Sequence, residues 1–481
     1  MQEITTDAPS RLFWIAFLSA LISYMVMYGF ELTHFTLSID EDSFDNFHHT
    51  VELGRWGHAF LRNYILPEPF VPFFTMALSI VITSAATAVS AVYLFKERQH
   101  VIGYTIICAS MPVLAYQFQF QNQSDTLSIA LLISSVMPIV FDRRELGLWR
   151  FAAFVALGSF AMSIYQSIIL LPVTLLLIKE LKLSLTSDVT LRAGVRKISG
   201  LFLLVVATYC LYSLATNFVQ NRFSIQASPY LSNMSSWGKD SFSNVTDGIW
   251  ENLWSRLSSD SHFGLNVYWI TIVPVCLMIV RSVFYRKAYP VLLALCIYII
   301  PFALDIITGT FLPARTLTQL PFCFASLILL SLLNVRSVYV YAISFVLLCI
   351  GSANSNRLFY ADYVSNKQDD QLSNMMISDL VSKYPKFNAK NDYIYFYGSD
   401  MLNNKWKPWK SENFGMSYFS FGDSRVIYYL NMTGFINLRR VDNSVINIMR
   451  NKIDSLPCWP QDGSIIKNEN NYIIKYCSDI F

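Results

Sequence analysis

Long apolar runs, separated by short polar connections, are the feature that most limits how this chain can fold. A bilayer-spanning helix needs about 20 mostly apolar residues, and about eleven such runs lie before residue 356. They lie near 12–32, 70–95, 101–118, 125–141, 151–165, 167–179, 199–219, 265–282, 288–307, 317–334 and 337–354. Only 14% of the residues are charged, against about 25% in a typical soluble domain. The sequence therefore predicts an α-helical polytopic membrane protein whose first run is an uncleaved transmembrane helix.

Two of these runs, 151–165 and 167–179, are short and meet at Tyr165-Gln166. They fit either a tight hairpin of two spans or one broken helix, and the residues leave both readings open.

Basic residues predict the orientation of the spans. Lys and Arg gather in alternate connections, such as the one with Arg143, Arg144 and Arg150, while the connection at 118–124 has none. Connections rich in Lys and Arg mark the cytoplasmic side. We therefore expect a cytoplasmic N-terminus and, with an odd number of spans, a C-terminus on the opposite side.

The composition becomes polar after residue 355, which predicts two domains. Residues 1–355 form the predicted transmembrane domain, with outer loops at 33–69 and 220–264. Residues 356–481 alternate helix-like and strand-like stretches and predict a soluble α/β domain on the outer side. The helix-like stretches are 369–383 and 443–453, and the strand-like ones are 393–397 and 472–476.

Cysteines point to the same division of the chain. Cys458 and Cys477 are the only two in the polar tail, which favours one disulfide in an exported domain, the alternative being two unpaired thiols. No spacing such as CxxC or HExxH occurs, so no metal site is predicted. The net charge of +3 is too small to indicate a nucleic-acid partner.

Polar residues crowd the outer ends of the predicted spans, as at Glu31, Asp305 and the polar stretch 116–125. Ionisable groups beside a span are functional candidates. A transporter, such as a lipid-linked sugar flippase, would place them near the bilayer midplane. This pattern favours a surface site, with a flippase as the alternative and a non-catalytic scaffold as a third reading.

The first outer loop is the densest in such residues. Asp40, Glu41 and Asp42 are adjacent, so at least one is expected to be held by a cation or a hydrogen bond, unless the run is simply solvated. His48 and His49 follow and are expected to be surface residues, the alternative being a role as ligands or bases. Gly54-Arg55-Trp56-Gly57 then fits either a tight turn with an interfacial anchor, or an Arg for phosphate beside a Trp for a sugar face.

The order of these motifs resembles the bacterial glucosyl transferase GtrII family. The resemblance is carried by the acidic cluster after the first span, Gly-Arg-Trp-Gly at 54–57, the prolines at 67, 69 and 72, Tyr165-Gln166, and Pro313-Ala-Arg315. It covers about residues 10–355, and the tail is expected to vary between members.

The resemblance implies a GT-C-like glycosyltransferase of the bacterial inner membrane, which modifies O-antigen in serotype conversion. The implied donor is a polyprenyl-phosphate sugar, typically undecaprenyl-phosphate glucose. The implied acceptor is a sugar hydroxyl of lipid-linked O-antigen at the periplasmic face, which the tail is expected to help bind. No cofactor is expected, and no metal is needed, although the acidic triplet could hold one.

Residue roles follow from that chemistry. Asp40 is the predicted base, assisted by Glu41 or Asp42, and it takes the proton from the acceptor hydroxyl. Arg55 and Arg315 are the predicted partners of the departing lipid phosphate. The other predicted substrate-binding residues are Trp56, Gln121, Asp125, Tyr165 and Gln166.

Overall fold

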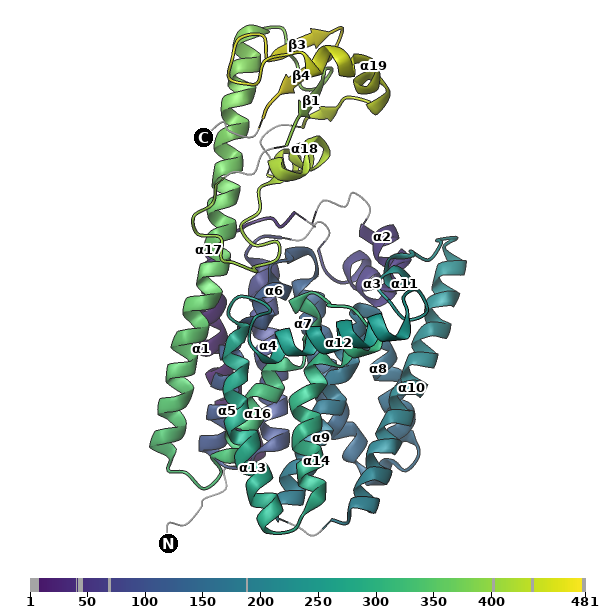
Figure 1. Cartoon of the computed structure of the whole chain (residues 1–481), viewed down its shortest axis with the longest axis vertical. Helices are drawn as coiled ribbons and strands as arrows, with labels where there is room; N and C mark the ends of the chain where they lie inside the picture. The colour runs from purple at the N-terminus through teal and green to yellow at the C-terminus, as the bar shows by residue number, and fades with distance from the viewer. Residues whose placement is uncertain are drawn as a thin grey trace. The chain divides into compact units, whose positions relative to one another are not determined.

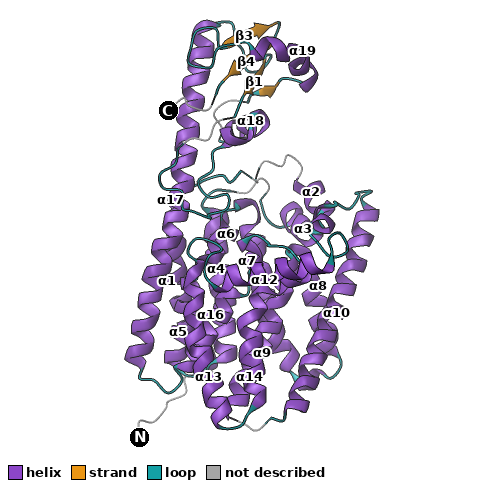
Figure 2. Cartoon of the chain, viewed as in Figure 1, coloured by secondary structure: helices purple, strands orange, loops and turns teal. Residues whose placement is uncertain are grey.

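The computed structural model describes residues 8–39, 41, 46–67, 71–186, 189–399, 403–433 and 437–477. Most of them are helical, and a small sheet lies near the C-terminus (Figure 2). The chain forms two compact units. Unit 1 comprises Met1–Thr33 and Asp45–Asn356, and unit 2 comprises His34–Phe44 and Arg357–Phe481.

Unit 1 is a bundle of long helices joined by short connections (Figure 1). Its long helices are α1 (Pro9–Thr33), α4 (Phe74–Leu94), α5 (Arg98–Ser110), α7 (Gln121–Asp142), α8 (Trp149–Ile164), α9 (Leu170–Thr186), α10 (Leu191–Arg222), α13 (Ile272–Phe284), α14 (Ala288–Ile299) and α16 (Leu320–Ser331). Its shorter helices are α2 (Asn46–Glu52), α3 (Trp56–Tyr64), α6 (Ala115–Phe118), α11 (Tyr230–Asn233), α12 (Phe242–Leu257) and α15 (Ala303–Thr308). Helix α17 (Ser337–Lys383) begins in unit 1 and continues into unit 2.

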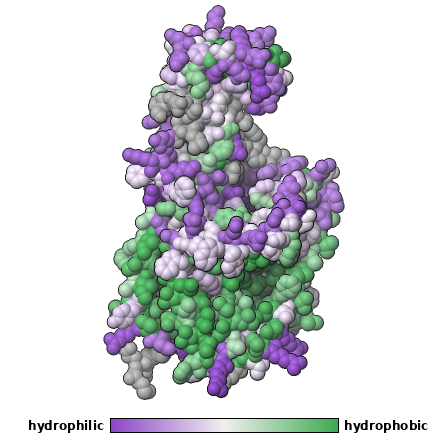
Figure 3. Space-filling model, viewed as in Figure 1, coloured by the Kyte–Doolittle hydropathy of each residue, from purple (hydrophilic) through white to green (hydrophobic). Residues whose placement is uncertain are grey.

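The helical membrane character predicted from the sequence is confirmed. Among the described residues, 7 helices are long and apolar enough to cross a membrane, or 8 if α5 and the bent segment Pro112–Phe118 form one span. All the predicted runs overlap helices, and the count of eleven spans stays a prediction. On the face drawn in Figure 3, hydrophobic side chains cover the middle of the bundle and hydrophilic ones gather at its ends.

Hydroxyl pairs join α4 to α7. Ser79 donates to Ser124 at 3.1 Å, Thr83 to Ser128 at 2.9 Å and Ser90 to Ser135 at 3.1 Å. The separation in sequence is 45 residues in each pair, so the two helices run in parallel. Small hydroxyl residues let helices approach closely in lipid. Since α4 and α7 are parallel, the chain between them must return along the bundle, as the predicted span at 101–118 requires.

The short runs that meet at Tyr165 form a hairpin of two helices. Helix α8 starts shortly after Asp142, the last residue of α7. Lys179 of α9 lies 2.5 Å from the same Asp142 carboxylate, so the start of α8 and the later part of α9 lie at one end of the bundle. Tyr165, with extended backbone, and the 3-10 turn Gln166–Ile169 lie at the turn between the helices.

Unit 2 contains a four-stranded sheet in the order β2-β1-β4-β3. Its strands are β1 (Tyr393–Tyr397), β2 (Arg439–Arg440), β3 (Ile465–Asn468) and β4 (Asn471–Lys475), and its remaining helices are α18 (Asp423–Met432) and α19 (Asn443–Asp454). β1 is parallel to β2 and β4, and β3 is antiparallel to β4. Ile446, Met449 and Ile453 of α19 pack in one core cluster with Ile473 of β4. The predicted strand-like stretches 393–397 and 472–476 are confirmed as β1 and β4. The predicted helix-like stretches 369–383 and 443–453 are confirmed within α17 and α19.

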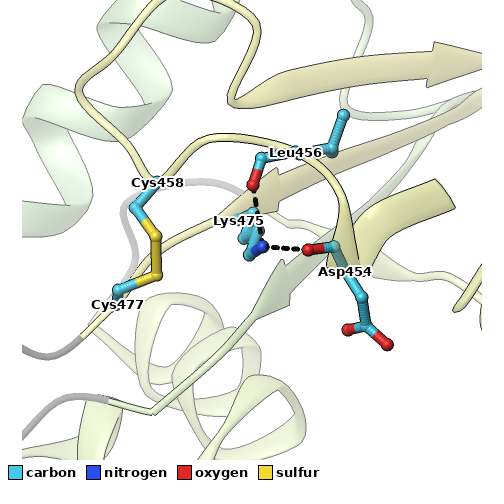
Figure 4. The surroundings of a disulfide bond; sticks show 5 residues. All are labelled: Asp454, Leu456, Cys458, Lys475 and Cys477. Carbon is cyan, nitrogen blue, oxygen red and sulfur yellow. Dashed lines mark hydrogen bonds between the residues drawn. A yellow bond between two sulfur atoms is a disulfide. The ribbon is translucent and has the colours of Figure 1, made fainter. Parts of the chain in front are cut away.

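A disulfide joins Cys458 to Cys477 just beyond β4, with 5.7 Å between their Cα atoms (Figure 4). Nearby, the Lys475 ammonium donates to the carbonyl oxygens of Asp454 and Leu456, each at 2.7 Å. These contacts and the bridge fasten the segment after α19 to the last strand.

Candidate functional site

The Gly54-Arg55-Trp56-Gly57 motif is the turn that leads into α3. Gly54 has φ +76°, and a Cβ there would lie 2.5 Å from the Tyr212 hydroxyl of α10. A Cβ on Gly57 would lie 2.1 Å from the Ser163 hydroxyl oxygen of α8. Both glycines are therefore required by backbone conformation or close approach, which positions Arg55 beside the α8–α9 turn.

Arg55 lies among side chains from two other elements. Its Nε donates to Gln166 Oε1 and its Nη1 to Gln123 Oε1, both at 3.4 Å. Its Cζ lies 4.9 Å from the centre of the Tyr165 ring. We name Arg55, Gln123, Tyr165 and Gln166 the Arg55 cluster. Both hydrogen bonds are long, so this guanidinium can rearrange to take an anion more readily than one in tight ion pairs.

Gln166 is fixed from its other side. Its amide nitrogen donates to the Leu53 carbonyl at 2.8 Å and to the Tyr212 hydroxyl at 3.2 Å. The Tyr212 hydroxyl donates in turn to the Gly54 carbonyl at 3.1 Å. The side-chain oxygen of Gln166 is thereby aimed at Arg55.

Arg315 is tied to the same cluster through its backbone. The Tyr165 hydroxyl donates to the Arg315 carbonyl at 3.4 Å, and the Gln117 amide donates to that carbonyl as well. The Arg315 guanidinium carbon lies 4.7 Å from the centre of the Phe120 ring. Tyr165 therefore contacts both predicted phosphate-binding arginines, one through its ring face and one through its hydroxyl.

Trp56, predicted to face a sugar, packs within the bundle. Its indole N–H donates to Thr216 of α10 at 3.2 Å. Its ring lies 6.4 Å from that of Phe60 and 6.1 Å from that of Phe160, between ring centres. This environment favours a role in holding α3 in place.

Asp125 and Gln121 belong to a buried network around Arg62. Arg62 donates to Asp125 at 2.6 Å, and the two side chains are 3% and 0% exposed. Arg62 also donates to the carbonyl oxygens of Asn122, Pro67 and Gln121. The Gln121 amide donates to Glu31 at 3.1 Å. This arrangement joins the ends of α1, α3 and α7 and favours a structural role for Asp125.

His58 lies in α3, between Arg55, which precedes the helix, and Arg62 within it. Its Nδ1 lies 2.8 Å from the Thr126 hydroxyl. Burial, reinforced by the positive charges of Arg62 and Arg55, lowers the pKa of His58 from 6.5 to about 3. The imidazole is therefore neutral at physiological pH and does not add to the positive charge of this region.

Asp305, another carboxylate near a span end, is also paired. Its Oδ2 accepts from Arg256 Nε at 3.0 Å, and its Oδ1 accepts from the Leu312 N–H at 3.0 Å. The Arg256 Cζ lies 3.9 Å from the centre of the Phe311 ring. This buried pair holds the connection that leads to Arg315.

The backbone before the acidic triplet belongs to unit 2. Leu37 exchanges two hydrogen bonds with the Asn366 side chain, at 3.0 and 3.2 Å. Tyr418 donates to the Ser38 carbonyl at 2.6 Å and Arg425 to the Ile39 carbonyl at 2.7 Å. Within the triplet, Glu41 is buried and accepts from the Ser38 N–H at 2.8 Å. Asp40 and Asp42 lie outside the described residues.

His58, Arg62, Gln123 and Tyr212 were not among the predicted site residues. A signal existed for two of them, because Arg55, His58 and Arg62 follow a spacing of three and four residues that puts them on one face of a helix. Tyr212 had no such signal, since its contacts with residues 54 and 166 are long-range. Among the described residues, no group of three or more His, Cys, Asp or Glu side chains could hold a metal ion.

The family model described as Glucosyl transferase GtrII matches residues 29–332. The matched range contains α3, the Arg55 cluster, the buried Arg62 network and Arg315. Comparisons with curated proteins and with solved structures give no match.

Proposed function

The chain belongs to the glucosyl transferase GtrII family, and on that premise we propose that it glucosylates lipid-linked O-antigen at the periplasmic face of the bacterial inner membrane. The proposed donor is undecaprenyl-phosphate glucose, and the acceptor is a sugar hydroxyl of the O-antigen. The family match carries this proposal and supports a glycosyltransferase, whereas it gives no support to a flippase.

A membrane-borne donor is consistent with the position of the Arg55 cluster. Arg55 precedes α3, Gln123 lies in the first turn of α7, and Tyr165 and Gln166 lie between α8 and α9. These are ends of helices, where a phosphate on a polyprenyl chain could remain at the bilayer surface while its chain stays in lipid. A GT-C-type enzyme with about eleven spans and an exported C-terminal domain fits this arrangement.

The proposed reaction is a displacement at the anomeric carbon. A carboxylate of the segment 40–42 takes the proton of the acceptor hydroxyl while the hydroxyl oxygen forms a bond to that carbon. The bond from the carbon to the phosphate oxygen breaks, and the lipid phosphate leaves with the electron pair. Arg55 and Arg315 would meet the added negative charge, because a guanidinium offers two parallel N–H groups to phosphate oxygens.

The direct test compares O-antigen from one strain with and without this gene. We expect a glucosyl branch that appears only with the gene. In membranes carrying the protein, the same transfer should require the polyprenyl-phosphate sugar and should not occur with a nucleotide sugar. An O-antigen identical in both strains would refute the proposed acceptor.

Replacing Arg55 or Arg315 by Lys should reduce transfer about 10- to 100-fold, because hydrogen bonds to charged groups contribute roughly 1.5–3 kcal/mol. Lys keeps the charge but loses the planar fork. Transfer rates in membranes, normalised to protein amount, provide the measurement. Arg222→Lys is the matched control, since Arg222 is an exposed arginine at the end of α10. Unchanged transfer by Arg315→Ala would leave Arg55 as the phosphate partner.

The proposed orientation has a separate test. With a cytoplasmic N-terminus and an odd number of spans, a reporter that works only in the cytoplasm should be inactive when fused after Phe481. The same reporter fused after Arg144, in a basic connection, should be active. Strong activity after Phe481 would mean an even number of spans.

A further inference from the structure

The segment 403–416 of unit 2, named here the Trp409 loop, is bound to one stretch of helix α17. The Asn404 amide donates to the Ala361 carbonyl at 2.8 Å, and the Gly415 N–H donates to Asp362 at 2.5 Å. The Trp406 ring meets that of Tyr360 edge-on, with 5.0 Å between centres. These contacts attach the loop to residues 360–362 of α17.

The loop presents aromatic and basic side chains to the outside. Trp409 is 81% exposed and Trp406 is 41% exposed, although large aromatic side chains usually lose more of their surface on folding. Lys405, Lys407 and Lys410 alternate with them and are exposed as well. With Arg357 on α17, these lysines outnumber the neighbouring acids Asp362 and Glu412. Tryptophan beside basic residues is typical of segments that lie among lipid headgroups.

Helix α17 itself indicates where the bilayer surface lies. Its exposed large apolar side chains include Val338 and Phe345, end at Ile350 and resume only at Met375. With a rise of 1.5 Å per residue, a hydrocarbon core about 30 Å thick takes about 20 residues, which from Ser337 reaches Asn356. The headgroup region adds a few ångströms, or about four or five residues. Residues 360–362, where the Trp409 loop is attached, lie at the outer edge of that region.

We propose that the Trp409 loop docks on the lipid surface of the bilayer that α17 spans, with Trp409 among the headgroups and Lys405 and Lys407 paired with anionic lipid phosphates. This binding surface is independent of the transfer reaction proposed above. It would fasten unit 2 to lipid at a second point besides α17.

The test uses the full chain, labelled with 5-fluorotryptophan, in nanodiscs of phosphatidylcholine with or without phosphatidylglycerol. The chain has 10 Trp residues, and Trp409→Phe identifies the fluorine line of Trp409 by its loss. A gadolinium chelate on a lipid headgroup should broaden that line strongly, and a soluble chelate should broaden it little. Ile448→Trp is the control, because Ile448 of α19 is 85% exposed and should respond in the opposite way.

Charge is tested by Lys405→Gln and Lys407→Gln. Each should weaken docking on phosphatidylglycerol about fivefold, as expected for one basic residue near an anionic surface. A Trp409 line that responds only to the soluble chelate would overturn the proposal. A Trp409 line that is unaffected by lipid but responds to added O-polysaccharide would also overturn the proposal. It would assign the loop to binding the acceptor instead. Equal broadening in neutral and anionic nanodiscs would refute the lysine–phosphate pairing.

Discussion

Asp40→Asn is expected to abolish O-antigen glucosylation while the protein is still made and folded. Asparagine keeps the size of the side chain but cannot accept the proton of the acceptor hydroxyl. A positioned general base contributes about 10²–10⁴-fold in rate, or roughly 3–5 kcal/mol. Transfer of labelled glucose in membranes, with protein amount determined by immunoblot, measures this loss. Asp240→Asn is the control, because Asp240 is an exposed carboxylate elsewhere in the chain.

The other two carboxylates of the triplet allow a sharper comparison. Glu41→Gln weakens the acceptor of the Ser38 N–H, so its effect should appear in thermal stability as well as in rate. Asp42→Asn should be milder than Asp40→Asn if Asp42 acts only by like-charge repulsion on Asp40. Full transfer by a variant with all three changes would exclude this segment as the source of the base.

Breaking the buried Arg62–Asp125 pair is expected to have the largest effect on stability. The two side chains are 3% and 0% exposed, so Arg62→Leu would leave an uncompensated buried carboxylate. Removing one partner of a buried pair costs about 3–5 kcal/mol. A large fall in thermal unfolding temperature in detergent, with reduced yield, is the expected observation.

The double variant separates the ion pair from the packing around it. Arg62→Leu with Asp125→Leu removes both charges and should recover part of the lost stability, because no unpaired charge remains. Lys197→Gln is the control: Lys197 pairs with Glu180 at 2.7 Å but is 56% exposed, and exposed pairs contribute about 0–1 kcal/mol. A single Arg62→Leu variant as stable as the Lys197→Gln control would contradict a scaffold role for this pair.

Local sequence patterns were enough to predict many of the elements. Long apolar runs gave the helices of the bundle, since a span must satisfy its backbone hydrogen bonds within the helix. The strand-like stretch 393–397 predicted β1, in which Ile394 and Phe396 are buried. The sequence also predicted the break at Tyr165-Gln166, and the contact between Lys179 and Asp142 identifies it as a hairpin.

Long-range pairing was beyond local patterns. The sequence around Asp125 does not indicate Arg62 as its partner, and the sequence around Asp305 does not indicate Arg256. These pairs join segments 63 and 49 residues apart. The bonds from Asn366, Tyr418 and Arg425 to the backbone at 37–39 span more than 300 residues. Partners so distant depend on the whole fold, which a periodicity does not encode.

Those bonds to residues 37–39 have a consequence for building chimeras within the family. The family match covers 29–332, so residues 37–39 lie inside the shared part of the chain while Asn366, Tyr418 and Arg425 lie outside it. A hybrid that joins this N-terminal part to another member's tail would place residues 37–39 against side chains from a different parent. Exchanging residues 34–44 along with the tail keeps both sides from one parent, and such hybrids should tolerate the swap better than those cut only at residue 356.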